Sequence, residues 1–130
     1  MFERYEYSGS QILNMDESAI YLDTPPNYTY ASKGLKRVKA VTTGAERVRI
    51  STAWTASASG NKLPIYALIP RTKPINELDQ IENLLVRYKS SSTFDWNIII
   101  EWLNVIVLPY KQARGFERIT VRYDYLPYLI

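Results

Sequence analysis

The run FDWNIIIEWLNVIVLPY, residues 94–110, decides whether this chain is an all-β or an α/β protein. Its Ile and Val residues favour strands, but the run is too long for a typical strand. Asn97, Glu101 and Asn104 recur at spacings of four and three residues, which is the period of one face of a helix. We therefore predict a buried helix with a narrow polar stripe, in which Glu101 faces solvent and is not a metal ligand.

Local signals predict the bounds of this helix. Ser92 followed by Asp95 fits a capping box with the shorter acid, and Pro109 provides a stop. The predicted helix runs from about Phe94 to Leu108.

Strand-like segments surround the helix. The segment RVRISTAWTA alternates cleanly, so that one of its two side-chain rows, the row with Trp54 or the row with Arg49, must face the core. We place Trp54 in the core together with Trp96 and Trp102, and we expect the tyrosines to serve packing rather than base stacking. The predicted strands are residues 11–22, 47–56, 62–70 and 119–125, with a weak further strand at 84–88.

The order strand, strand, strand, helix, strand is an α/β pattern: an antiparallel unit followed by a helical crossover that returns a strand to the same sheet. We predict one domain over residues 1–130, with residues 1–10 disordered or tag-like. If the returning strand pairs with the first, Asp16 and Asp124 lie on neighbouring strands, and two such carboxylates can share a divalent cation.

Composition excludes several classes of chemistry. The chain has no Cys and no His, so thiolate nucleophiles, zinc–thiolate sites and histidine-dependent hydrolases are excluded. No apolar run reaches the length of a membrane span, and the charged start MFERYEYSGS does not fit a secretory signal, so we expect a soluble intracellular protein without membrane contact. Any catalysis must use carboxylates, most simply with Mg²⁺ or Mn²⁺.

Asp16 and Glu17 stand side by side inside a strand-like run, where desolvation of a carboxylate is costly. From the residues alone, the pair fits a bulge, an edge, an ion pair or a metal site. Asp124 likewise fits either a solvated strand end beside Arg122 or a metal ligand.

Basic residues gather between residues 28 and 50, where Glu46 is the single acid. Such a run is either a solvated face or a surface that contacts nucleic-acid phosphates. The candidate nucleic-acid-binding residues are Lys33, Lys36, Arg37, Lys39, Arg47 and Arg49.

Several motifs in order resemble the DDE catalytic domain of pogo and Tigger-type transposases. The first part of the match comprises Met15-Asp16-Glu17-Ser18, Lys33-Gly34, Thr42-Thr43-Gly44-Ala45-Glu46, Thr55-Ala56 and Ser59-Gly60-Asn61-Lys62-Leu63-Pro64. A looser part comprises Glu101-Trp102-Leu103, Leu108-Pro109-Tyr110 and Ile119-Thr120-Val121-Arg122-Tyr123-Asp124.

The resemblance implies an RNase H-like fold whose acidic residues bind two divalent cations and promote in-line displacement at a DNA phosphodiester. Asp16 would be the first metal ligand and catalytic residue, and Asp124 the second. The family places a histidine shortly after its second aspartate and a third acidic ligand further on, and this chain shows neither. We therefore expect a truncated core with weak or absent cation binding and little or no DNA cleavage on its own.

The resemblance leaves two functions open. The chain is either the remnant of a nuclear enzyme that cuts and joins DNA, or a repurposed non-catalytic module that binds DNA or protein. Truncation would also leave the strand at residues 119–125 with an open edge, through which copies of the chain could associate.

Overall fold

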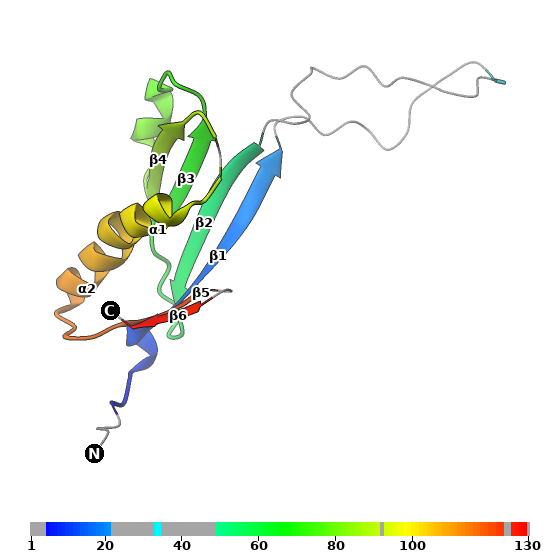
Figure 1. Cartoon of the computed structure of the whole chain (residues 1–130). Helices are drawn as coiled ribbons and strands as arrows, with labels where there is room; N and C mark the ends of the chain where they lie inside the picture. Colours follow the sequence, from blue (N-terminus) through cyan, green and yellow to red (C-terminus); the bar gives the residue numbers. More distant parts are fainter. Residues whose placement is uncertain (1–4, 22–32, 35–48, 92, 124–125, 130) are drawn as a thin grey trace.

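A computed structural model describes residues 5–21, 33–34, 49–91, 93–123 and 126–129, which form an α/β domain around a six-stranded mixed sheet (Figure 1). The strand order is β4-β3-β2-β1-β5-β6. The strands are β1 (Ile12–Tyr21), β2 (Arg49–Ser57), β3 (Ile65–Pro70), β4 (Leu84–Lys89), β5 (Thr120–Tyr123) and β6 (Leu126–Leu129).

The pairing follows the predicted order. Strands β1, β2 and β3 form an antiparallel unit, and β5 returns parallel to β1 after the helix. The weak strand expected at residues 84–88 is present as β4, which runs parallel to β3. This topology is compatible with an RNase H-like fold, and it makes β1 a central strand.

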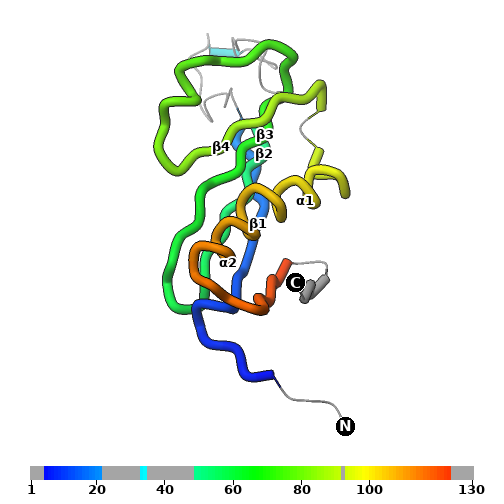
Figure 2. Tube along the Cα trace, turned by 90° about the vertical axis from the view of Figure 1, so that its left-hand side faces the viewer, coloured from blue at the N-terminus to red at the C-terminus, as the bar shows by residue number. Residues whose placement is uncertain are grey.

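A single helical stretch crosses one face of the sheet (Figure 2). It comprises α1 (Trp96–Trp102), a π-helical turn η3 (Leu103–Val107) and α2 (Leu108–Arg114). Elsewhere in the described residues lie two short 3₁₀ turns, η1 (Gly9–Gln11) and η2 (Asn76–Gln80).

The helix begins close to its predicted start, but its cap residue and its end differ from the prediction. The N-cap is Asp95 itself, whose Oδ1 accepts a hydrogen bond from the backbone N–H of Ile98 at 3.0 Å, and Ser92 lies outside the described residues. Pro109 does not stop the helix, because it follows the wider π turn and stands in the first turn of α2, where its missing N–H is tolerated. The helix ends at Gly115, whose φ of 67° is the left-handed conformation that glycine adopts without strain.

The core lies between the helix and the sheet. Trp102 is its largest fully buried side chain, 1% exposed, and its indole Nε1 donates a hydrogen bond to Thr55 Oγ1 at 3.2 Å. Apolar residues of β1, β3 and β5 belong to the same core, among them Leu13, Met15, Tyr66, Leu68 and Val121.

The buried row of β2 is the opposite of the predicted one. Ser51, Ala53, Thr55 and Ser57 face the helix and are buried, whereas Trp54 is 48% exposed on the other face. Small side chains in this row leave room for the indole of Trp102 against the strand. Trp96 is also exposed, at 57%, so of the three tryptophans predicted in the core only Trp102 is there.

The edge expected to be open is paired. Strand β6 lies antiparallel to β5, with Val121 opposite Tyr128 and Tyr123 opposite Leu126, so β5 has neighbours on both sides. A short strand at residues 126–129, which was not predicted from the sequence, takes this position. The proposed self-association through the 119–125 strand therefore loses its structural basis.

Residues 5–10 contact the domain, although a disordered segment was predicted there. Ser8 caps η1, and the backbone carbonyl of Ser10 accepts a hydrogen bond from Tyr110 Oη at 2.8 Å. The guanidinium of Arg118 lies 5.1 Å from the ring centre of Tyr5.

Candidate functional site

Asp16 lies on the face of the sheet that the helix does not cover. Leu13 and Met15 point into the core, and Asp16, of opposite pleat, is exposed. The pairing of β1 with β2 is continuous from Leu13 to Tyr21, which excludes a bulge against β2 as the reason for the acidic pair. The strand tolerates this carboxylate because its face of the sheet is open to water.

Glu17 points to the opposite face from Asp16. Its Oε1 accepts a hydrogen bond from Tyr123 Oη at 2.6 Å, which links β1 to β5 on the helix-covered side. Glu17 therefore has a structural contact of its own.

The strand that ends before Asp124 lies directly beside the strand that contains Asp16. The described register between β1 and β5 runs from Ile12 opposite Thr120 to Met15 opposite Tyr123. Asp124 itself lies outside the described residues, so the predicted proximity of the two carboxylates stays a prediction.

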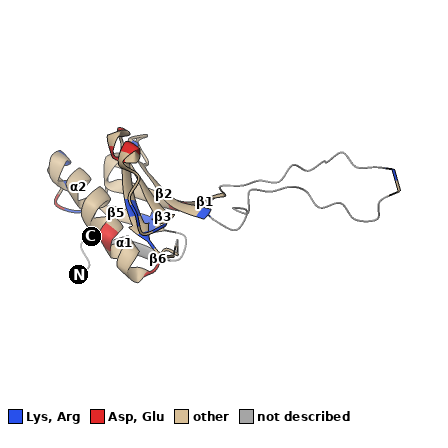
Figure 3. Cartoon of the chain, turned by 90° about the horizontal axis from the view of Figure 1, so that it is seen from above, with Lys and Arg blue, Asp and Glu red and all other residues tan. Residues whose placement is uncertain are grey.

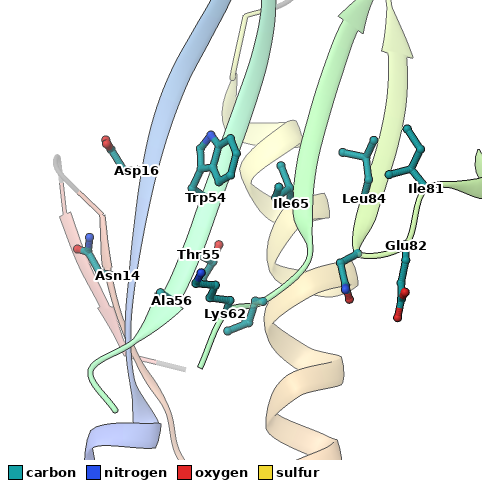
Figure 4. A pocket seen from close by; sticks show the side chains of 12 residues that line it. Asn14, Asp16, Trp54, Thr55, Ala56, Lys62, Ile65, Ile81, Glu82 and Leu84 are labelled. Atoms are coloured by element: carbon teal, nitrogen blue, oxygen red, sulfur yellow. The ribbon is translucent and has the colours of Figure 1, made fainter. Parts of the chain in front are cut away.

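A cavity of about 630 Å³ opens next to Asp16 (Figure 4). Trp54 is the cross-strand partner of Asp16 and lies between it and the aliphatic side chains of β3 and β4. We call this the Trp54 pocket; it is defined by Asp16, Trp54, Lys62, Ile65, Glu82 and Leu84, with further walls from neighbouring residues.

Hydrogen bonds fix the indole of Trp54. Its Nε1 donates to Thr52 Oγ1 at 2.8 Å, and Thr52 Oγ1 donates to the backbone carbonyl of Ser18 at 3.0 Å. Trp54 was not predicted from the sequence as a site residue. The alternating row of small Ser, Ala and Thr residues in the same strand could have indicated its position. Small side chains leave space for a tryptophan of the buried helix, so this row faces the helix and Trp54 faces the other side.

Glu101 was expected on a solvent stripe, but the structure gives it two partners. Arg87 forms an ion pair with Glu101 Oε1, and Tyr66 Oη donates to Oε2 at 3.0 Å. Burial and the hydrogen bond to Glu101 raise the pKa of the Tyr66 phenol well above its usual value. This group ties the helix to β3 and β4, and Glu101 is remote from the Trp54 pocket lining.

A second ion pair binds the start of the helix to β4. The Lys89 ammonium donates to Asp95 Oδ2, and this hydrogen bond, together with the one from the Ile98 N–H, lowers the pKa of the Asp95 carboxyl. The role of Asp95 is thus structural.

Two of the six predicted nucleic-acid-binding residues are described. Lys33 precedes Gly34 in a turn, Arg49 begins β2, and both side chains are exposed. Lys36, Arg37, Lys39 and Arg47 lie outside the described residues. In the described part, acidic and basic positions are interspersed (Figure 3).

The described residues do not form a complete site for Mg²⁺ or Mn²⁺. Within them, no group of three or more Asp, Glu, His or Cys side chains converges. Asp16 and Glu82 both line the Trp54 pocket but lie at its opposite ends (Figure 4). Mg²⁺ requires near-octahedral oxygen ligands, and Asp16 alone does not provide them.

Comparison with known proteins adds one relationship. Over 68 residues the chain is 34% identical to the protein "Pogo transposable element with KRAB domain" of Mus musculus and equally to that of Homo sapiens. The similarity indicates a transposase-related origin. The matched residues are 52% of this chain and 11% of each relative, so the chain spans about a tenth of the length of these relatives.

The other comparisons gave no match. No family model matches the chain, and no solved structure matches it. In the described part of the chain, no helix is both long and apolar enough to cross a bilayer.

Proposed function

We propose that this chain is part of a transposase-derived catalytic core with an RNase H-like fold, and that it binds DNA in the nucleus without cleaving it on its own. The similarity to pogo element proteins supports the origin, and the antiparallel β1-β2-β3 unit with a helical crossover to a parallel β5 supports the fold.

The parallel pairing of β5 with β1 is the observation that carries this proposal. It ends at Met15 opposite Tyr123, and each of these residues is followed in sequence by one of the two predicted metal ligands, Asp16 and Asp124. The topology therefore provides the strand arrangement that the resemblance requires.

Binding without cleavage is favoured by the surroundings of Asp16. Its cross-strand partner is an indole, and Glu82, the other carboxylate in the described lining of the Trp54 pocket, lies at the opposite end of the cavity beyond aliphatic side chains (Figure 4). Cation binding at Asp16 should accordingly be weak, and the basic segment from Lys33 to Arg49 would supply affinity through phosphate contacts.

Salt dependence of duplex DNA binding tests the proposal. Each lost phosphate contact should reduce the slope of log affinity against log salt by about 0.9. Replacing Lys36, Arg37 and Lys39 together by alanine should therefore flatten the slope by up to about 2.7. The matched control replaces the exposed cations Arg71, Lys73 and Arg114 by alanine. It changes the net charge by the same amount and should leave the slope of log affinity against log salt close to that of the unmodified chain.

The same preparations should not nick supercoiled plasmid in Mn²⁺. Salt-independent DNA binding would refute the phosphate contacts. Nicking that Asp16→Ala abolishes and Glu17→Gln preserves would show that the chain is an active nuclease and overturn the non-cleaving part of the proposal.

A further inference from the structure

We propose that the Trp54 pocket binds one unpaired nucleobase of single-stranded DNA, stacked on the indole of Trp54 with a preference for cytosine or adenine over thymine. This inference rests on the proposed DNA-binding function and specifies the part of the nucleic acid that enters the pocket next to Asp16.

Trp54 provides the stacking surface. Half of its side chain is exposed, although its strand lies inside the sheet, and the hydrogen bond from Nε1 to Thr52 Oγ1 fixes the ring. A tryptophan held in one orientation loses little conformational freedom when a planar ligand binds. Stacking on such a ring tolerates any base, because every base has a π face.

Aliphatic side chains provide the facing wall. Ile65 begins β3, Leu84 begins β4, and Ile81, which is 48% exposed, precedes β4; all three line the Trp54 pocket across from the indole (Figure 4). Proteins that bind unpaired bases hold them between aromatic and apolar side chains in this manner. The cavity volume of about 630 Å³ is ample for one base with its sugar, and a base inside a duplex could not enter it.

Charge in the pocket determines which part of a nucleotide enters. Asp16 and Glu82 bring two carboxylates against the single ammonium group of Lys62, so the lining repels phosphate and admits a neutral ring. Carboxylate oxygens accept hydrogen bonds from the exocyclic amino groups of cytosine and adenine, which thymine lacks. The amides of Asn14 and Asn83 also line the cavity and can bind either edge of a base.

Fluorescence anisotropy with labelled oligo(dC), oligo(dA) and oligo(dT) at fixed salt tests the inference. Trp54→Ala should weaken oligo(dC) binding by about 5- to 150-fold, the effect of losing one stacked base, and Trp54→Phe should restore most of it. The matched control is Trp96→Ala, which removes an equally exposed tryptophan outside the pocket and should leave the affinity unchanged.

A second variant tests the hydrogen-bonding edge without altering the stacking surface. Glu82→Ala should reduce the preference for oligo(dC) and oligo(dA) over oligo(dT) while leaving oligo(dT) binding in place. Melting curves by circular dichroism confirm that each variant is folded.

The outcomes separate this inference from the proposed function. Salt-dependent duplex binding combined with equal effects of Trp54→Ala and Trp96→Ala on oligo(dC) would overturn the base pocket and leave the proposed function standing. Absence of any binding to oligonucleotide or duplex would overturn both. If the chain bound the three oligonucleotides with equal affinity, and Trp54→Ala but not Trp96→Ala weakened that binding, the stacking would be retained and the base preference refuted.

Discussion

Trp54 and Trp102 lie on opposite sides of the sheet. Trp102 is part of the helix and packs against the covered face, whereas Trp54 is part of β2 and lies on the uncovered face. Trp102 fills the space between the helix and β2 and is almost fully buried, whereas Trp54 is half exposed next to Asp16. The free energy of unfolding should therefore depend far more on the first residue than on the second.

Trp102→Ala should lower the free energy of unfolding by about 3–5 kcal/mol, because it leaves a large cavity in the core and removes the hydrogen-bond donor to Thr55. Alanine at position 54 should lower it by about 1 kcal/mol or less, as at other exposed sites. Urea titrations of both variants measure the difference. Equal losses would contradict the exposed position of Trp54 on β2.

The helix is the element that fixes the covered face of the sheet. Asp95 caps it, the π turn η3 precedes Pro109, and Gly115 ends it with a positive φ. A side chain at Gly115 would meet open space, so any cost of substitution there comes from the backbone conformation alone.

Gly115→Ala should destabilise the domain by about 1 kcal/mol, since alanine is strained in the left-handed conformation. Gly115→Asn should cost less, because asparagine tolerates that conformation better than other residues with a side chain. Thermal unfolding of the two variants next to the unmodified chain measures this order. Equal melting temperatures for all three would contradict the left-handed helix end.

The sheet as a whole has β4 and β6 as its outer strands, and β6 covers the edge of β5. Removing residues 126–130 would leave the backbone groups of β5 that face β6 unpaired, next to the apolar residues Val121 and Tyr123. An unpaired apolar edge is a template for pairing with another chain.

The chain shortened to residue 125 should therefore self-associate at concentrations at which the full chain does not. Sedimentation velocity of both forms over a concentration series measures this, and circular dichroism establishes that the shortened form keeps its sheet. A folded, monomeric shortened chain would show that β6 does not protect the edge.

Local patterns in the sequence were sufficient for β1 to β5, for the helix and for their order, but not for β6. The alternation in residues 47–56 marks a strand, the spacing of Asn97, Glu101 and Asn104 marks a helix, and the order of the elements limits the sheet to few topologies. The sequence also placed Asp16 inside a strand, as the structure shows.

Only the tertiary structure decided which row of each strand is buried. An alternating strand has two rows of side chains, and the sequence pattern is the same whichever row meets the helix. Which row is buried depends on the fit of Trp102 against Thr55, two residues far apart in sequence. The pairing of β6 and the Trp54 pocket have the same origin. Each depends on the shape of a distant partner, which a local pattern does not encode.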